Sequence, residues 1–431
     1  MILRDPVHGL LAFEGDAERV VTALLQSREV QRLRHIRQLG LTSLVFPGAE
    51  HTRFAHALGA AHVMLRLLAR LRALGSQLPA PERPDREAER DALAAALLHD
   101  LGHGPFSHLF EDVVPEARSH EAWTHEIISD SGTQVHRALR GLDPGMPERV
   151  TGLLGGHHRS GYLARAVSGT LDVDRCDYLL RDSHMTGVRY GLYDLDWLLH
   201  GFCFARAGVE GTWVIAIDGR KGLSAIEEFF LARQFMYQQV YHHKSTRAAE
   251  TLIRAILKRA AGLVRAGECR LQVPPAVKAA ALGEKASLGD YLDLDDVQLL
   301  ACFRSWRRGS DPVLADLTAR LAERRLPKTL DLPEDDKLWR EALVSARSLA
   351  QERGFDPELT VWLHVASDVP YLEPDDRSSA GLWVAQAGGR VQRLGQASFL
   401  LGELRNKPIV RPLLIVPAEL RSELKLLVES S

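Results

Sequence analysis

The feature that most constrains this chain is an Ala- and Leu-rich segment that ends in two side chains able to bind a metal. Residues 91–98 are almost entirely Ala and Leu, and His99 and Asp100 follow directly. Such a run of good helix formers predicts a strong helix, and Gly102 with the Gly104-Pro105 pair predicts where it ends. The sequence therefore predicts a mainly α fold in which an imidazole and a carboxylate lie at the rim of the core.

The pattern along the chain changes at about residue 268. Before it the periodicity is mainly helical, with one helix expected over 52–74 and one or two over 223–263, whereas residues 78–89 are expected to form an exposed connection. After it, strand patterns occur at 359–365, 381–386 and 409–416. We therefore expect a helical domain over 1–267 and a smaller C-terminal mixed α+β lobe over 268–431.

Composition disfavours several classes of protein. The formal net charge is -2, from 54 basic and 56 acidic residues, so strong nucleic-acid binding is not expected. No apolar run approaches the roughly 18 residues that span a bilayer, and we expect no membrane insertion. The four cysteines form no C-x-x-C pair, which argues against a zinc ribbon and a disulfide framework. A reducing, cytoplasmic location is the expectation.

Two further residues complete a set of candidate metal ligands. His56 lies upstream of the His99-Asp100 pair and Asp174 lies downstream. A lone His-Asp pair is usually a polar helix end, but the order His, His-Asp, Asp favours a metal site. Imidazole and carboxylate ligands suit Fe, Mn or Mg. Four such ligands would leave open positions for water and a phosphate oxygen.

A family resemblance rests on nine short segments distributed along the chain. They are Asp5-Pro-Val-His-Gly, Gln31-Arg-Leu-Arg, Gln38-Leu-Gly, Phe46-Pro-Gly-Ala, Arg53-Phe-Ala-His56, residues 99–108, Trp123-Thr-His-Glu126, Asp172-Val-Asp-Arg-Cys-Asp-Tyr-Leu-Leu-Arg-Asp182 and Tyr241-His-His-Lys244. With these, the chain resembles the deoxynucleoside triphosphate (dNTP) triphosphohydrolases of the HD superfamily, among them the catalytic domain of the SAM-and-HD-domain enzyme and its bacterial homologues. Beyond Lys244 the match is looser.

The resemblance implies an HD-domain helical core and a hydrolase. A dNTP would be cleaved to deoxynucleoside and tripolyphosphate by attack of metal-activated water at the α-phosphorus. His103 and His125 match histidines that lie close to the α-phosphate, with Glu111 and Glu126 as their carboxylate partners. His108 matches the family's candidate general acid, and Glu111 stands where relatives often have Asp.

The resemblance also implies a set of substrate contacts. Basic side chains are expected to contact the phosphates and the sugar, and Tyr178 is expected to select deoxyribose. Gln38 and Leu39 are expected to flank the base. The expected set is Gln38, Leu39, Arg53, Arg175, Tyr178, Asp182, Arg233, Tyr241, His242 and Lys244. Two members depart from the family pattern, because Arg175 replaces Lys and His242 replaces Gln.

An allosteric nucleotide site is implied less strongly. Gln31 and Arg34 match positions that select guanine in nucleotide-activated relatives, and Lys221 is a candidate phosphate contact. Gln26 replaces the acidic residue expected there, which puts guanine activation in doubt. A homo-oligomer, in some relatives a tetramer built around activator nucleotides, is expected only from the resemblance.

Two alternatives remain open at this stage. The first keeps the chemistry but changes the substrate to a 5′-monophosphate, a cyclic dinucleotide or an alarmone. The second is a nucleotide-sensing or single-stranded nucleic-acid-binding protein with vestigial catalysis. The complete set of four candidate ligands argues against the second alternative.

Overall fold

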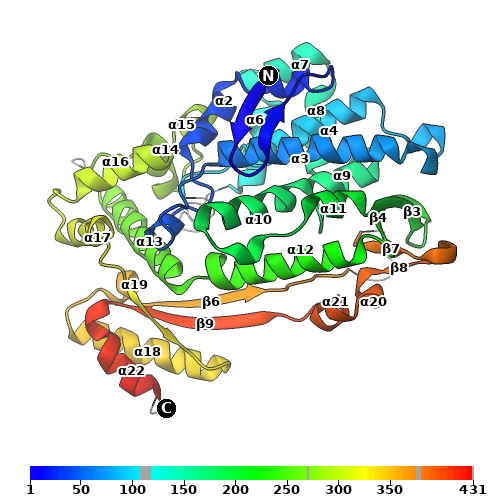
Figure 1. The fold of residues 1–431 in the computed structure, drawn as a ribbon. Coiled ribbons are helices and arrows are strands. Elements are labelled where there is room, and N and C mark those ends of the chain that lie inside the picture. Colours follow the sequence, from blue (N-terminus) through cyan, green and yellow to red (C-terminus); the bar gives the residue numbers. More distant parts are fainter. Residues whose placement is uncertain (107–117, 269–270, 375–379, 430–431) are drawn as a thin grey trace.

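The computed structural model describes residues 1–106, 118–268, 271–374 and 380–429 (Figure 1). Its central element is α4 (Arg86–Leu98), the helix expected from the Ala- and Leu-rich run. Every residue from Asp91 to Leu98 is buried. A helix that is apolar on all sides is a core helix, and α4 accordingly packs against α1 (Arg19–Leu24), α3 (Arg53–Ala73), α8 (Met146–Leu154) and α9 (Gly161–Val167).

The helix α4 begins earlier than the sequence pattern suggests. Asp85 is its N-cap and accepts a hydrogen bond from the Ala88 backbone N–H, and Glu87 and Glu89 follow in the first turn. Acidic residues at this end offset the positive end of the helix dipole. The expected exposed connection therefore ends at Asp85, and residues 86–89 are helical.

The helices α3 and α10 (Val173–Thr186) lie side by side across the core (Figure 1). Asp172 caps α10 by accepting from the Arg175 N–H, and Gly187, with a φ of 76°, ends it in the left-handed conformation. Gly59 makes the close approach of the two helices feasible, because a Cβ there would overlap the side chains of Asp177 and Arg181. The N-terminal hairpin, β1 (Ile2–Asp5) and β2 (Gly9–Ala12), contacts α10 through a hydrogen bond from Arg181 to Asp5.

The expected long helical stretch divides into two helices. The first is α12 (Leu223–Met236) and the second is α13 (Lys244–Arg265). A π-helical turn, Tyr237–Tyr241, lies between them, with the His242 N–H bonded to the Tyr237 carbonyl at 2.9 Å. π-Helical turns are rare and are often found at functional sites.

The strands form three sheets. The β1–β2 hairpin is one. The second is ordered β3 (Phe202–Ala207), β4 (Thr212–Asp218), β7 (Trp383–Ala385) and β8 (Val391–Arg393), with β4 and β7 parallel. The third is antiparallel, with β9 (Ile409–Val416) between β5 (Lys328–Asp331) and β6 (Trp362–Asp368). The helices α18 (Asp336–Glu352) and α22 (Arg421–Glu429) lie against this last sheet (Figure 1).

The remaining helices complete the packing around these elements. They are α2 (Arg28–Arg32), α6 (His120–Ser129), α7 (Gln134–Leu142), α11 (Leu195–His200), α14 (Pro275–Ala281), α15 (Leu288–Leu292), α16 (Asp296–Trp306), α17 (Pro312–Ala322), α19 (Pro357–Thr360), α20 (Leu394–Ala397) and α21 (Phe399–Leu404).

The mainly α fold with a smaller α+β portion is confirmed. Strand β9 occupies the expected region 409–416, and β7 lies within the expected region 381–386. The strand expected over 359–365 begins only at Trp362, as β6, because Asp356 caps the short helix α19 over Pro357–Thr360. The division of the chain at residue 267 stays a prediction, and β7 pairs with β4 across it. Within the described ranges, no helix combines the length and apolarity needed to cross a membrane.

Candidate metal centre and substrate cavity

Three side chains from three helices converge on one point. His56 lies in the first turn of α3, His99 at the C-terminal end of α4, and Asp174 in the first turn of α10. The His56 Nε2 atom lies 3.1 Å from His99 Nε2 and 3.0 Å from Asp174 Oδ1. The His99 Nε2 atom lies 3.4 Å from the same Asp174 oxygen. The sequence placed these residues up to 118 positions apart, and the helix packing brings their donor atoms together.

The other nitrogen of each imidazole already has a partner. His56 Nδ1 lies 2.8 Å from Asp177 Oδ2, and His99 Nδ1 lies 2.9 Å from the Ala96 carbonyl oxygen. Both partners are acceptors, so each Nδ1 carries the donated hydrogen and each Nε2 is left for the shared point. A metal-binding histidine usually has this arrangement, in which a carboxylate or carbonyl sets the tautomer.

The donor set fits a divalent cation. Two ligand atoms bound at about 2.1 Å to one ion lie roughly 3.0–3.4 Å apart at neighbouring positions of octahedral or tetrahedral geometry. The three observed separations fall within or at the edge of that range. Two imidazoles and a carboxylate are also the donor chemistry of Fe, Mn or Zn sites. His56, His99 and Asp174 could therefore hold a divalent ion.

Asp100, the fourth expected ligand, lies beside this group. Its oxygens are 3.7 Å from His56 Nε2 and 3.6 Å from His99 Nε2. One oxygen also forms an ion pair with Arg53, and the other lies 3.3 Å from His103 Nε2. Its role as a ligand stays a prediction.

The electrostatics of the group favour positive charge at its centre. Burial lowers the pKa of His56, but hydrogen bonds to Asp174 and Asp177 outweigh burial and raise the pKa to about 10. Burial raises the pKa of Asp174, but the effect of His99 and His56 is larger, and the pKa lies below its ordinary value. The surrounding carboxylates thus stabilise a cation at this position.

The group borders a polar cavity of about 450 Å³. Asp100 and Asp174 lie in its wall with the predicted residues Arg53, His103 and Arg175. A cavity of this volume suits a nucleotide-sized ligand. Burial, and then the charge of Arg53, holds the pKa of His103 well below its ordinary value, so this ring is neutral near pH 7.

Further lining residues come from α10 and from the region of the π-helical turn. They are Tyr178, Asp182, Tyr241 and His242. Asp182 is buried and accepts a hydrogen bond from the Tyr241 hydroxyl at 2.8 Å, while His51 Nε2 lies 2.7 Å from its other oxygen. These contacts fix the direction of the Asp182 carboxylate. The predicted residues Gln38 and Leu39 also line the cavity.

Among the described residues, four of the predicted catalytic and substrate-binding residues lie outside the lining of this cavity. Arg233 is ion-paired with Asp368 at 2.9 Å and stacks over Tyr237 at 4.3 Å from the ring centroid. Lys244 lines a second cavity of about 310 Å³, together with Arg324, Lys328 and Arg421.

The other two are His125 and Glu126. His125 is exposed on α6, and its Nδ1 atom lies 3.5 Å from Ser129 Oγ. Glu126 pairs with Arg118 and, at 3.7 Å, with Lys285. Within the described residues, Glu126 contacts these two basic side chains and not His125, its expected partner. His108 and Glu111 lie outside the described residues.

His120 also lines the cavity, although no sequence motif assigns it a role. Its ring stacks on His103 with centroids 3.9 Å apart. Positions 120 and 125 lie about 140° apart around an α-helix, so α6 can present only one of them to the cavity. The helix α6 can lie close to the His99–His103 segment because Gly102 has no Cβ. A Cβ at this position would overlap the α6 backbone. In the sequence, the presence of a second histidine five residues before His125 is the feature that could have indicated this alternative.

Two of the three candidate activator residues, Gln31 and Arg34, contact each other. The Gln31 amide donates to the Leu25 carbonyl at 2.6 Å, and Arg34 donates to Gln31 at 2.7 Å and covers the Phe54 ring. Lys221 is exposed in the turn between β4 and α12. Their allosteric role stays a prediction.

A helical core that brings His, His and Asp donors to the edge of a polar cavity defines the metal-binding HD class of fold. The HD domain family model matches residues 53–182. The chain is 34% identical over 409 residues to the uncharacterized protein YwfO of Bacillus subtilis, covering 94% of this chain and 89% of that protein. This protein therefore belongs to the HD-domain family.

Two further relatives extend the comparison. Human deoxynucleoside triphosphate triphosphohydrolase SAMHD1 is 30% identical over 285 residues, which cover 58% of this chain and 43% of that protein. The chain thus matches less than half the length of that relative. A crystal structure of a phosphohydrolase from Bacteroides thetaiotaomicron superposes with a TM-score of 0.79 at 26% identity, covering 96% of this chain and 99% of that one.

Proposed function

We propose that this protein is a metal-dependent phosphohydrolase that converts a dNTP to a deoxynucleoside and tripolyphosphate. The observation that carries the proposal is the His56, His99 and Asp174 group at the edge of a nucleotide-sized cavity. The name of the SAMHD1 relative states this activity, and the match to it includes more than half of this chain.

A triphosphate needs cationic partners because it carries about four negative charges near neutrality. A bound divalent ion would supply Lewis acidity and lower the pKa of a coordinated water. Arg53 and Arg175 line the cavity and carry permanent positive charge. Arg175 is held by the Gly169 carbonyl at 2.6 Å and by Asp172, so its guanidinium has a defined position for phosphate.

The departing deoxynucleoside requires a proton. In the proposed step a water molecule gives up one proton to the solvent and its oxygen bonds to the α-phosphorus, the bond from phosphorus to O5′ breaks, and O5′ takes a proton from a side-chain donor. His103 is a poor donor, because its ring is neutral near pH 7 and its Nε2 lies toward Asp100. His120, stacked on His103, is the donor candidate among the described residues, and His108 keeps this role as a prediction from the family resemblance.

The sugar is expected to lie against Tyr178, Tyr241 and Asp182. The Asp182 carboxylate is directed by His51 and Tyr241 and can accept a hydrogen bond from the 3′-hydroxyl. The Tyr178 ring lies near both His56 and Tyr241, with centroids 6.4 and 6.1 Å away. A ring in this position would leave no room for a 2′-hydroxyl.

The proposal includes the binding of an activator nucleotide and the formation of a homo-oligomer. Light scattering with and without a dNTP mixture would test both, since activator-dependent assembly increases the molar mass. A mass that stays at one chain in both conditions would contradict them.

A substrate panel tests the proposed function. Metal-loaded protein would be incubated with each dNTP, and in parallel with 5′-monophosphates, a cyclic dinucleotide and an alarmone. The proposal predicts that at least one dNTP is cleaved faster than every other class. Faster cleavage of another class would retain the HD hydrolase and refute the substrate.

A further inference from the structure

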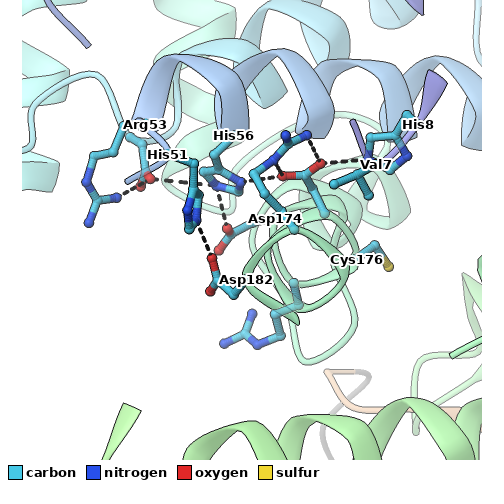
Figure 2. A network of polar contacts seen from close by, with 12 residues as sticks. Val7, His8, His51, Arg53, His56, Asp174, Cys176 and Asp182 are labelled. Carbon is cyan, nitrogen blue, oxygen red and sulfur yellow. Dashed lines mark hydrogen bonds and ion pairs between the residues drawn. The ribbon is translucent and has the colours of Figure 1, made fainter. Parts of the chain in front are cut away.

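The N-terminal hairpin reaches the metal centre through one buried carboxylate. His8, in the turn between β1 and β2, lies with its Nε2 atom 2.6 Å from Asp177 Oδ1. The other Asp177 oxygen lies 2.8 Å from Nδ1 of the metal-ligand candidate His56. Figure 2 shows His8 and His56 connected through this network. A residue near the chain start is therefore two hydrogen bonds away from a ligand.

Asp177 is saturated with donors. Oδ1 accepts from His8 and from Arg181 Nη2 at 2.8 Å, and Oδ2 accepts from His56 and from Arg181 Nε at 2.8 Å. A carboxylate offers about four acceptor positions, and these four bonds occupy them. Without the His8 donor, Oδ1 would keep only its hydrogen bond from Arg181. The orientation of the Asp177 carboxylate, which directs His56, would then be less restrained.

The turn itself is built to hold His8 in place. One Asp5 oxygen accepts from the backbone N–H groups of Val7 and His8, each at 2.9 Å. The other accepts from Arg181 Nη1 at 2.7 Å, which closes the network. The side chains of His8, Asp177 and Arg181 are 3%, 0% and 1% exposed. Water therefore cannot readily replace a missing donor here.

We propose that His8 is a positioning residue for metal binding: it fixes Asp177 so that His56 Nε2 is directed at the ion. This inference rests on the metal site of the proposed function but not on its substrate. Partners of this kind typically change metal affinity by about 10–100-fold when they are removed.

The test measures Mn²⁺ affinity of the full-length apoprotein by electron paramagnetic resonance, with melting temperature as a parallel readout. His8→Phe keeps a ring but removes the N–H donor, and His8→Gln restores an amide donor. Leu3→Ala is the matched control, because Leu3 packs the same hairpin onto the core without a bond to Asp177. Asp177→Asn serves as a second test should His8→Phe fail to fold.

We expect the Mn²⁺ dissociation constant to rise about 10–100-fold in His8→Phe. The His8→Gln and Leu3→Ala variants should stay within a few-fold of the parent, even where the melting temperature falls. Unchanged Mn²⁺ affinity in His8→Phe or in Asp177→Asn would overturn the inference, and so would an equal loss in Leu3→Ala. A parent that binds no Mn²⁺ would overturn the metal site as well. Failure of dNTP hydrolysis would refute only the substrate, because this readout needs no turnover.

Discussion

At the candidate metal centre, the Nε2 atoms of His56 and His99 owe their direction to the bond that Nδ1 of the same ring makes. His56 is directed by Asp177 and His99 by the Ala96 carbonyl. Asp174 is partly exposed and faces the two imidazoles, and its described ion-pair contacts are with these two rings. Loss of its charge should therefore affect metal binding far more than folding.

The first prediction concerns Asp174→Asn. This change removes a ligand charge and also an acidic group from the first turn of α10, which costs about 0.3–1 kcal/mol of stability. We expect purified protein to lose most of its bound metal, measured by plasma mass spectrometry, with a small drop in melting temperature. Glu210→Gln, in the exposed turn between β3 and β4, is the control. Metal content equal to the parent would contradict Asp174 as a ligand.

A second prediction separates two histidines of α6. His120 lines the cavity, whereas His125 is exposed. If His120 donates the proton, His120→Gln should lower kcat for dNTP hydrolysis by about 10²-fold or more, and His125→Gln should change it less than a few-fold. The family resemblance favours the reverse order. A larger loss in His125→Gln than in His120→Gln would contradict His120 as the proton donor.

At the scale of elements, the site depends on how closely α3 and α10 approach. The Thr52–Leu74 pattern predicted α3 to within a residue or two, because apolar periodicity is a local property. The π-helical turn at Tyr237–Tyr241 could not be predicted in the same way. A π-helical turn is a change in backbone hydrogen bonding, and the apolar periodicity of the side chains does not indicate it. Tyr237 and Tyr241, at the two ends of this turn, both line the cavity.

The third prediction tests the contact between the two helices. Gly59→Ala would place a methyl group against Asp177 and Arg181 and push α3 away from α10. Overpacking of this kind costs about 1–3 kcal/mol, and here it also disturbs the partner of His56. Denaturant unfolding should show that loss, and Mn²⁺ titration should show weaker binding. Gly262→Ala, where a Cβ meets open space, should leave both quantities close to the parent.

At the scale of the whole molecule, the sequence predicted the helical core and the approximate positions of three strands. It did not predict that β7 pairs in parallel with β4, or that Lys244 lies in a separate cavity from Arg53. Those relations depend on packing between distant segments. His51 and Asp177 were likewise missed as positioning groups, because their partners are distant in the sequence.

A fourth prediction concerns stability at low pH. Burial, and then the charge of Arg247, lowers the pKa of both His242 and His364 to about 4, and Arg254 acts on His364 in the same direction. The unfolded value is about 6.5. The unfolded chain therefore binds more protons between pH 6.5 and 4, and the free energy of unfolding falls as pH falls through this window.

The variant His364→Phe removes one of these groups. Its melting temperature, followed by circular dichroism, should fall less steeply between pH 7 and pH 5 than that of the parent. Parallel losses in the two proteins would contradict the account of His364.

The measurement that tests the central claim most directly is product analysis in ¹⁸O-labelled water. Protein loaded with Mn²⁺ would be incubated with the four dNTPs, and the products would be separated by ion exchange and weighed by mass spectrometry, with Asp174→Asn as the control. The account predicts intact tripolyphosphate that carries one ¹⁸O, unlabelled deoxynucleoside, and no products from the variant. Orthophosphate or a deoxynucleoside monophosphate as the product, label in the deoxynucleoside, or no turnover of any dNTP would contradict it.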